Sequence, residues 1–181
     1  MNAIQSCKRA SLALLVSGLI ACGGGGGDND DDNEPPPNGG TPLTAGVPGL
    51  VGDWLENGCT AAGGQSFKRL VRAVALTSTS IAYSQGVVSY PNTSCTSPGT
   101  LTGPSRLGDV VFSRSGSNER VAANWGEFTT ITGTRSAVVW GKKSETVLCL
   151  LGDQTPSILP TLAAVESSLA TLSNQGCFTR Q

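Results

Sequence analysis

The stretch that decides the fold is Gly52-Asp53-Trp54, which stands where the composition of the chain becomes ordinary. All three tryptophans and both tyrosines of the 181 residues lie beyond Gly49. Glycine, aspartate and proline dominate residues 23–47, which precede it. About 130 residues therefore remain to fold, which is enough for one small domain with its own apolar core. We place this domain at residues 48–181.

Most of the domain has the pattern of β-strands. Ile81, Tyr83 and Val87 alternate with small or polar residues, and a similar alternation runs through Val110, Phe112 and Arg114. Residues 137–140 and 147–151 are short apolar runs with the length of buried strands. Clusters typical of turns lie between these segments: Ser97-Pro98-Gly99, Gly103-Pro104-Ser105 and Ser115-Gly116-Ser117-Asn118.

Two segments have apolar residues at helical spacing. In residues 67–76 these are Phe67, Leu70, Val71 and Val74, but we expect a strand there because of the family resemblance described below. Near the C-terminus, Leu162, Val165, Leu169 and Leu172 follow i, i+3, i+7 and i+10, with Pro160 suited to the first turn and Gly176 to the end. The second segment predicts one amphipathic helix, followed by a short strand around residues 177–180.

Four cysteines lie in the domain: Cys59, Cys95, Cys149 and Cys177. An even number in an exported chain indicates two disulfides, for which three pairings are possible. We favour Cys59–Cys95 with Cys149–Cys177, because each pair closes a separate half of the domain. A zinc site is the alternative, but the chain has no Cys-x-x-Cys and no histidine, so we expect no metal.

The Gly52-x-Trp54 motif, the series of antiparallel strands, the late helix and the last strand together resemble the lipocalins and the wider calycin group. More narrowly, Gly52-x-Trp54 followed by Cys59, and then Tyr90-x-Asn92-x-x-Cys95, is similar to small lipocalin-like domains of exported bacterial proteins. The resemblance covers about residues 49–181. It implies a mainly β fold, a small antiparallel β-barrel with one C-terminal helix.

The resemblance also implies structural roles for particular residues. Gly52 and Trp54 would plug the closed end of the barrel. In lipocalins an arginine packs on this tryptophan, and Arg135 and Arg180 are the candidates here.

The N-terminus has the features of an export signal. Lys8 and Arg9 precede an apolar stretch, Ala10–Ile20, that is too short to span a bilayer core. Leu19-Ile20-Ala21-Cys22 then resembles the lipobox of bacterial lipoproteins, which implies removal of residues 1–21 and acylation of Cys22. Gly23 in place of aspartate implies, by the same resemblance, an outer-membrane anchor with the domain in the periplasm. An ordinary secretory signal is the alternative.

Residues 22–47 are expected to form a tether. The glycine run, the acidic cluster of residues 28–34 and the prolines cannot bury a core, so we predict a disordered linker. A phosphate-binding loop would require a lysine after the glycines, and none follows. A calcium loop would require glycine at Asn33 and glutamate at Gly39.

The domain lacks the groups that most enzymes use. Without histidine, neither a Ser-His-Asp triad nor most metal sites can form. Its carboxylates belong to no recognisable motif, and we interpret them as solvated surface groups rather than a glycosidase pair: Asp53, Glu56, Glu127, Glu145, Asp153 and Glu166. The net charge of the chain is -1, and the basic residues of the domain are scattered, unlike those of a nucleic-acid-binding surface. We therefore predict a non-catalytic domain without a cofactor or a nucleic-acid partner.

Two classes of function remain. The first is binding of a small apolar ligand in the barrel mouth, which the lipocalin resemblance implies. The second is a protein-interaction module of the cell envelope, either an enzyme inhibitor or an assembly accessory, for which a long tether is suited. The composition does not decide between a hollow barrel and one filled by side chains. A cavity of several hundred cubic ångströms would favour the ligand carrier.

Overall fold

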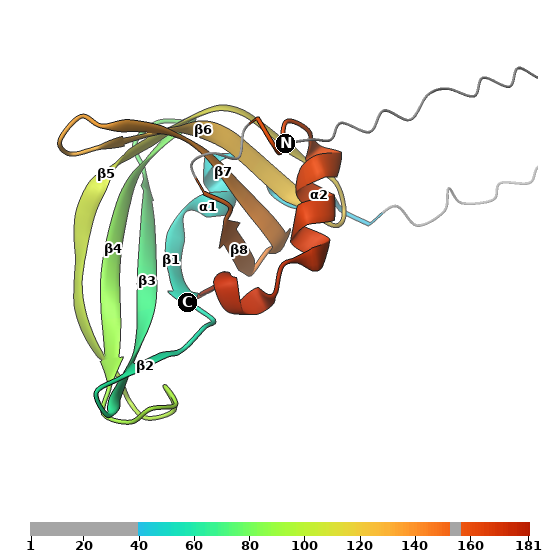
Figure 1. Cartoon of the computed structure of the whole chain (residues 1–181). Coiled ribbons are helices and arrows are strands. Elements are labelled where there is room, and N and C mark those ends of the chain that lie inside the picture. The colour runs from blue at the N-terminus through green and yellow to red at the C-terminus, as the bar shows by residue number, and fades with distance from the viewer. Residues whose placement is uncertain (1–39, 153–156) are drawn as a thin grey trace, which may run out of the picture. The chain divides into compact units, whose positions relative to one another are not determined.

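The computed structural model describes residues 40–152 and 157–181 (Figure 1). Its strands are β1 Gly52–Glu56, β2 Thr60–Ala62, β3 Gln65–Ala75, β4 Ser80–Tyr90, β5 Thr100–Ser117, β6 Ala122–Thr130, β7 Arg135–Ser144, β8 Val147–Leu150 and β9 Phe178–Arg180. The helices are α1 Val47–Leu50 and α2 Leu162–Thr171, with a 3-10 turn at Asn174–Gly176. Within these ranges no helix is both long and apolar enough to cross a membrane.

The strands form one antiparallel sheet that closes on itself. Neighbours follow the order β1-β9-β8-β7-β6-β5-β4-β3-β2, and β1 also pairs with β3. Trp54 of β1 is registered with Val71 of β3 on one side and with Arg180 of β9 on the other. Eight strands make the barrel, and β2 is an extra strand paired with β3. The predicted fold, a small antiparallel β-barrel with one C-terminal helix, is confirmed.

The strand expected at residues 67–76 is confirmed as β3. Val71 and Ala73 are buried, whereas Arg72 between them is partly exposed and Val74 is half exposed. Side chains two residues apart share one face of a strand, so this alternation places Val71 and Ala73 inside the barrel. Leu70 is buried on the opposite face. The helical spacing in the sequence arises because both faces of this strand carry apolar residues.

Two of the three predicted turns are wrong. Gly103-Pro104-Ser105 lies inside β5, where the pairing with β4 skips Gly86 on the facing strand. Proline, which cannot donate a backbone hydrogen bond, is tolerated where the ladder is interrupted in this way.

The other wrong turn prediction concerns the end of β5. Residues 115–117 pair with β6, and of that cluster only Asn118 lies in the turn. Its Oδ1 accepts hydrogen bonds from the backbone N–H groups of Arg120 and Val121. The turn is therefore made by one asparagine side chain rather than by the Ser-Gly-Ser run before it.

The predicted C-terminal helix is confirmed as α2, with a different start. Thr161 is its N-cap, and the Thr161 Oγ1 accepts a hydrogen bond from the Ala164 N–H at 3.2 Å. Pro160 therefore precedes the cap instead of occupying the first turn. Gly176 lies beyond the helix, in the 3-10 turn that leads to β9.

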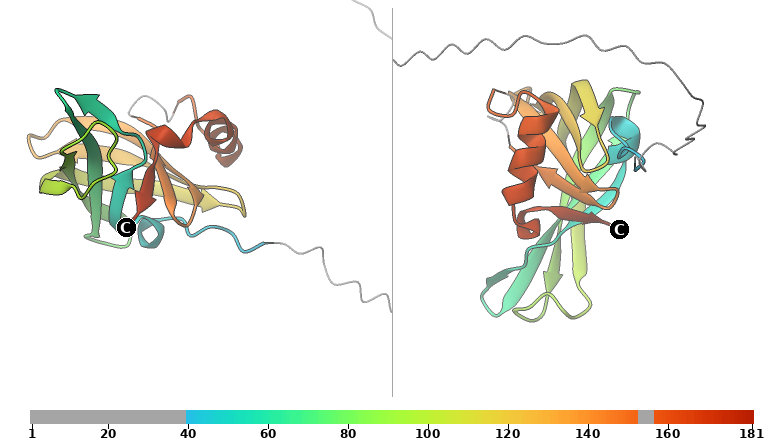
Figure 2. Two further views of the ribbon diagram at one scale, coloured as in Figure 1. Left: turned by 90° about the horizontal axis from the view of Figure 1, so that it is seen from below. Right: turned by 90° about the vertical axis from the view of Figure 1, so that its right-hand side faces the viewer.

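Helix α2 lies on the outside of the barrel, against β6 and β7 (Figure 2). Val165 and Leu169 of the helix are buried and form a second apolar core with residues from the outer face of the sheet. Gly141 of β7 permits the close approach, since a Cβ at this position would lie 2.9 Å from the Leu169 Cδ1.

The two predicted disulfides are confirmed. Cys59–Cys95 joins the β1–β2 connection to the β4–β5 loop, and Cys149–Cys177 joins β8 to the residue before β9. Cys149 and Cys177 are fully buried beneath α2, whereas Cys59 is exposed.

Residues 43–46, which the sequence assigned to the linker, are bound to the barrel; we call this segment the strap. The Leu43 N–H donates to the Asn118 carbonyl at 2.9 Å, and the Gly46 N–H donates to the Asn124 Oδ1 at 2.6 Å. The strap continues directly into α1, whose Val47 and Leu50 are buried in the core. Cys22, the lipobox and the rest of the predicted linker up to residue 39 lie outside the described residues.

Candidate functional site

Gly52 and Trp54 lie where α1 leads into the barrel. Gly52 has a φ of 135°, in a region that favours glycine, so the first residue of the Gly-x-Trp motif is required by the backbone. Trp54 is fully buried, and its indole Nε1 donates to the Leu50 carbonyl at 2.8 Å. The tryptophan thereby fixes the end of α1 to β1.

Arg180, not Arg135, packs on Trp54. The Arg180 Cζ lies 4.6 Å from the centre of the Trp54 ring, and its Nη2 donates to the Gly49 carbonyl at 2.9 Å. Arg135 instead lies near Glu127, with 3.5 Å between the Arg135 Nη1 and the Glu127 Oε1. The register of β9 against β1 explains the difference, because it sets Arg180 directly beside Trp54.

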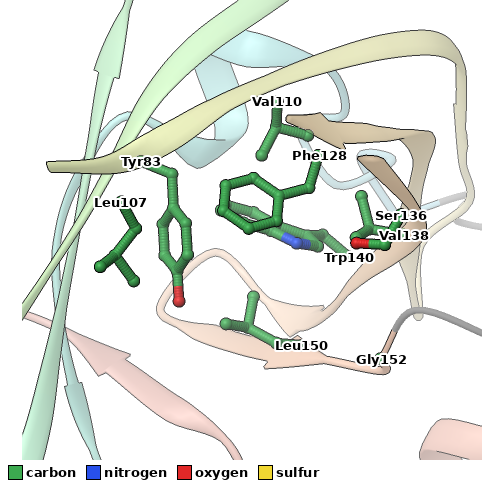
Figure 3. A pocket seen from close by; sticks show the side chains of 9 residues that line it. All are labelled: Tyr83, Leu107, Val110, Phe128, Ser136, Val138, Trp140, Leu150 and Gly152. Atoms are coloured by element: carbon green, nitrogen blue, oxygen red, sulfur yellow. The ribbon is translucent and has the colours of Figure 1, made fainter. Parts of the chain in front are cut away.

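An apolar pocket of about 400 Å³ lies inside the barrel (Figure 3). Its lining comes from β4 to β8 and from the second residue after β8: Tyr83, Leu107, Val110, Phe128, Ser136, Val138, Trp140, Leu150 and Gly152. Neither Gly52 nor Trp54 belongs to this lining. The residues that the sequence singled out for the site therefore support the barrel, and other residues shape its cavity.

Aromatic rings form one wall of the pocket. Tyr83 meets both Phe128 and Trp140 edge to face, with 5.5 Å between ring centres in each pair. Phe112, a residue of the core, also packs edge to face against Trp140, with 5.8 Å between the ring centres. Edge-to-face pairs at these distances are favourable beyond the area that they bury. The wall is thus held by contacts among its own rings.

The Tyr83 hydroxyl is a polar group within this pocket. Figure 3 shows it at the free end of the ring, between Leu107 and Leu150. Burial raises the pKa of Tyr83, and the positive charge of Arg69 opposes that effect only in part. The phenol therefore stays protonated at neutral pH and can donate a hydrogen bond.

Glu56 and Arg69 form an ion pair on the neighbouring strands β1 and β3. The Arg69 Nε and Nη2 donate to the Glu56 Oε1 at 3.1 and 2.6 Å, and the Arg69 backbone N–H donates to the Glu56 Oε2 at 3.0 Å. Burial, the largest influence on Glu56, raises its pKa, but the hydrogen bonds and charge of Arg69 outweigh it and the net pKa is lowered. Both residues line a second cavity of about 380 Å³ together with Thr60, Phe67, Lys68 and Val87.

The described carboxylates that could have formed a catalytic pair are dispersed among different cations. Asp53 pairs with Arg72, Glu56 with Arg69, Glu127 with Arg135, Glu145 with Lys142 and Glu166 with Arg120. Asp153 lies outside the described residues. None of the five described carboxylates lines the apolar pocket.

Comparison of the chain with protein-family models, with curated proteins and with solved structures gives no match.

Proposed function

We propose that the domain binds a small, mostly apolar molecule inside the barrel. The observation that carries this proposal is the pocket of about 400 Å³ lined by Tyr83, Phe128, Trp140 and aliphatic side chains. Ligand pockets in proteins have volumes of roughly 300–1,000 Å³ and are lined mainly by apolar and aromatic residues with a few polar groups. An interaction module with a filled barrel does not need such a space.

The arrangement of the rings explains how the apolar pocket keeps its shape. Protein interiors are close-packed, and side chains around a void relax into it where they can. Tyr83, Phe128 and Trp140 are held by mutual edge-to-face contacts, and Trp140 is buried against Phe112. Movement of one ring into the pocket would break these contacts, so the cavity is preformed for a ligand.

Titration with N-phenyl-1-naphthylamine, a neutral apolar fluorophore, tests the proposal. We expect its emission to rise on binding with a dissociation constant in the micromolar range. The Ser136→Phe variant, which adds a ring to the pocket lining, should weaken binding at least tenfold. Ser167→Phe, on the exposed face of α2, is the matched control and should bind like the wild type. Absence of binding to the folded wild type up to about 100 μM would contradict the proposal and favour the envelope interaction module.

We also propose that the chain is a lipoprotein anchored through Cys22 to the outer membrane, with the barrel in the periplasm. The lipobox-like Leu19-Ile20-Ala21-Cys22 supports the anchor, and two disulfides are suited to an oxidising compartment. Several acyl chains on one residue make attachment effectively permanent. Mass spectrometry of the mature N-terminus should find acylated Cys22, and Cys22→Ser should release the protein from membranes. A mature N-terminus without acyl groups would contradict this proposal.

A further inference from the structure

We infer that the pocket selects apolar molecules that carry one neutral hydrogen-bond acceptor, such as a ketone, ester or amide carbonyl, and that it disfavours carboxylates. The acceptor receives its hydrogen bond from the Tyr83 hydroxyl. This inference rests on the proposed function and specifies the ligand class.

The position of Tyr83 on the sheet gives its side chain room to act. Its neighbours across the ladder are Ala73 on β3 and Gly108 on β5, the two smallest residue types. A Cβ at Gly108 would lie 2.8 Å from the Phe128 Cε2, so the Phe128 ring occupies that side, and Ala73 leaves space on the other. Phe128 and Trp140 hold its ring, so the hydroxyl is fixed in place before a ligand arrives.

The Tyr83 hydroxyl is available for a ligand. No described residue forms a hydrogen bond with it, and it projects into the space that Leu107 and Leu150 also line (Figure 3). The hydroxyl oxygen is accessible to solvent, and a ligand acceptor that replaces water there makes a hydrogen bond in mostly apolar surroundings. The raised pKa of Tyr83 agrees with a donor role.

The lining of the pocket does not favour an anion, because it contains no charged residue. Arg69 is the cation that acts on Tyr83, but its Nε and Nη2 are bound to Glu56. The Glu56 side chain is only 14 % exposed and stays ionised beside it. A carboxylate in the pocket would lose its hydration, and no charged residue of the lining would replace it. A neutral carbonyl avoids this cost.

Ser136 is the other hydroxyl of the lining, and its position differs. It is the second residue of β7, directly after the exposed residues 131–135, and it is registered with Phe128. No aromatic contact holds it in the way that Phe128 and Trp140 hold the Tyr83 ring. Selection of the acceptor is therefore assigned to Tyr83 rather than to Ser136.

Three probes of similar size test the inference by displacement of N-phenyl-1-naphthylamine: benzophenone, diphenylmethane and diphenylacetate. The first two differ by one carbonyl, and the third carries a carboxylate. The measured quantity is the ratio of the diphenylmethane to the benzophenone dissociation constant. We expect this ratio to fall about tenfold in Tyr83→Phe and to stay at the wild-type value in Tyr90→Phe, the matched control at a tyrosine outside the pocket. Diphenylacetate should bind at least tenfold more weakly than benzophenone.

The outcomes separate this inference from the proposed function. If neither N-phenyl-1-naphthylamine nor any of the three probes binds the folded protein, both are overturned; if the fluorophore binds but none of the three probes displaces it, only the inference is overturned. If diphenylmethane binds but Tyr83→Phe leaves the ratio unchanged, or Ser136→Ala changes it instead, only the role of Tyr83 is overturned. Equal or tighter binding of diphenylacetate overturns the preference for neutral ligands. Infrared spectroscopy of benzophenone bound to the wild type adds a measurement that needs no variant: its carbonyl stretch should move to lower frequency, and an unshifted band overturns the hydrogen bond.

Discussion

The guanidinium of Arg180 lies 4.6 Å from the centre of the Trp54 ring and joins the last strand of the barrel to the first. The same guanidinium donates to the Gly49 carbonyl, while the Trp54 indole donates to the Leu50 carbonyl. Both side chains thus hold the end of α1. Because of this arrangement, the structural role expected for Gly52 and Trp54 can be tested by substitution of Arg180.

Arg180→Met should lower the free energy of unfolding by about 1–3 kcal/mol. Methionine keeps an apolar stem over Trp54 but removes the cation–π contact and the hydrogen bond to Gly49. Urea denaturation measures the change. Arg120→Met is the control, because that side chain is 82 % exposed with only a surface pair to Glu166, and its effect should stay within about 0.5 kcal/mol. Equal effects of the two variants would contradict a special role for Arg180.

Lys142 should prove necessary for docking of the strap. Its side chain is 0 % exposed, and its ammonium donates to the Thr44 carbonyl at 3.0 Å and to the Glu145 Oε2 at 2.6 Å. The Thr44 N–H also donates to the Glu145 Oε1 at 2.6 Å. We call this arrangement of Thr44, Lys142 and Glu145 the clasp. Lys142→Met should cost about 1–3 kcal/mol and make residues 43–46 susceptible to protease under native conditions.

The control for the clasp is Lys68→Met on β3, which makes the same chemical change at a lysine with no part in the clasp. Glu145→Gln keeps one carbonyl oxygen for Lys142, so it should release the strap less than Lys142→Met does. Limited proteolysis followed by mass spectrometry measures the release of the strap in both variants. Protection of residues 43–46 in Lys142→Met equal to that in the wild type would contradict the clasp.

Stability should decline as the pH falls below about 4. A hydrogen bond and charge from Arg72 lower the pKa of Asp53, and a hydrogen bond from Lys142 is the largest cause of the lowered pKa of Glu145. A carboxyl whose pKa is lower in the folded state contributes stability that is fully present above its unfolded pKa, about 4. That contribution is lost as the pH falls through the folded value.

The midpoint of urea denaturation, measured from pH 7 to pH 2, checks this dependence. Asp53→Asn and Arg72→Met remove opposite halves of one ion pair, with 2.6 Å between the Arg72 Nε and the Asp53 Oδ1. Each variant should therefore reduce the fall of the denaturation midpoint at acid pH by a similar amount. A fall as steep in both variants as in the wild type would show that this pair does not contribute to the acid sensitivity.

The sequence predicted those features of the fold that depend on local pattern. Alternation around Ile81 and Val110, the spacing of Leu162 to Leu172 and the even number of cysteines are local signals, and they identified strands, α2 and both disulfides. The turn at Gly103-Pro104-Ser105 was wrong because a bulge inside a long strand uses the same residue types as a turn.

The pocket could not be predicted in the same way. Tyr83 and Trp140 were identified only as strand residues, and Phe128 carried no signal at all. They meet because the barrel closes and because its register, including the bulges of β4 and β5, turns them toward one space. The strap was missed for a related reason: it is bound through backbone groups of Leu43, Thr44 and Gly46, which composition does not reveal.

The two disulfides should differ in their resistance to reduction. A thiolate must reach a disulfide sulfur to open the bond, and Cys59 is exposed whereas Cys149 and Cys177 are fully buried beneath α2. Cys95 also has a φ of 54°, a region that non-glycine residues rarely occupy, so reduction and rearrangement of this loop relieve a local cost. Under a mild dithiol without denaturant, alkylation should therefore label Cys59 and Cys95 first, and Cys149 and Cys177 only after the barrel unfolds. Mass spectrometry of the alkylated peptides determines the order.

Because the loops span 36 and 28 residues, the chain-entropy model assigns about 3.5–4 kcal/mol to each disulfide. A difference in the stability that each disulfide contributes therefore cannot produce such an order. Simultaneous labelling of all four cysteines would mean that reduction proceeds through global unfolding, and that exposure of Cys59 does not govern it.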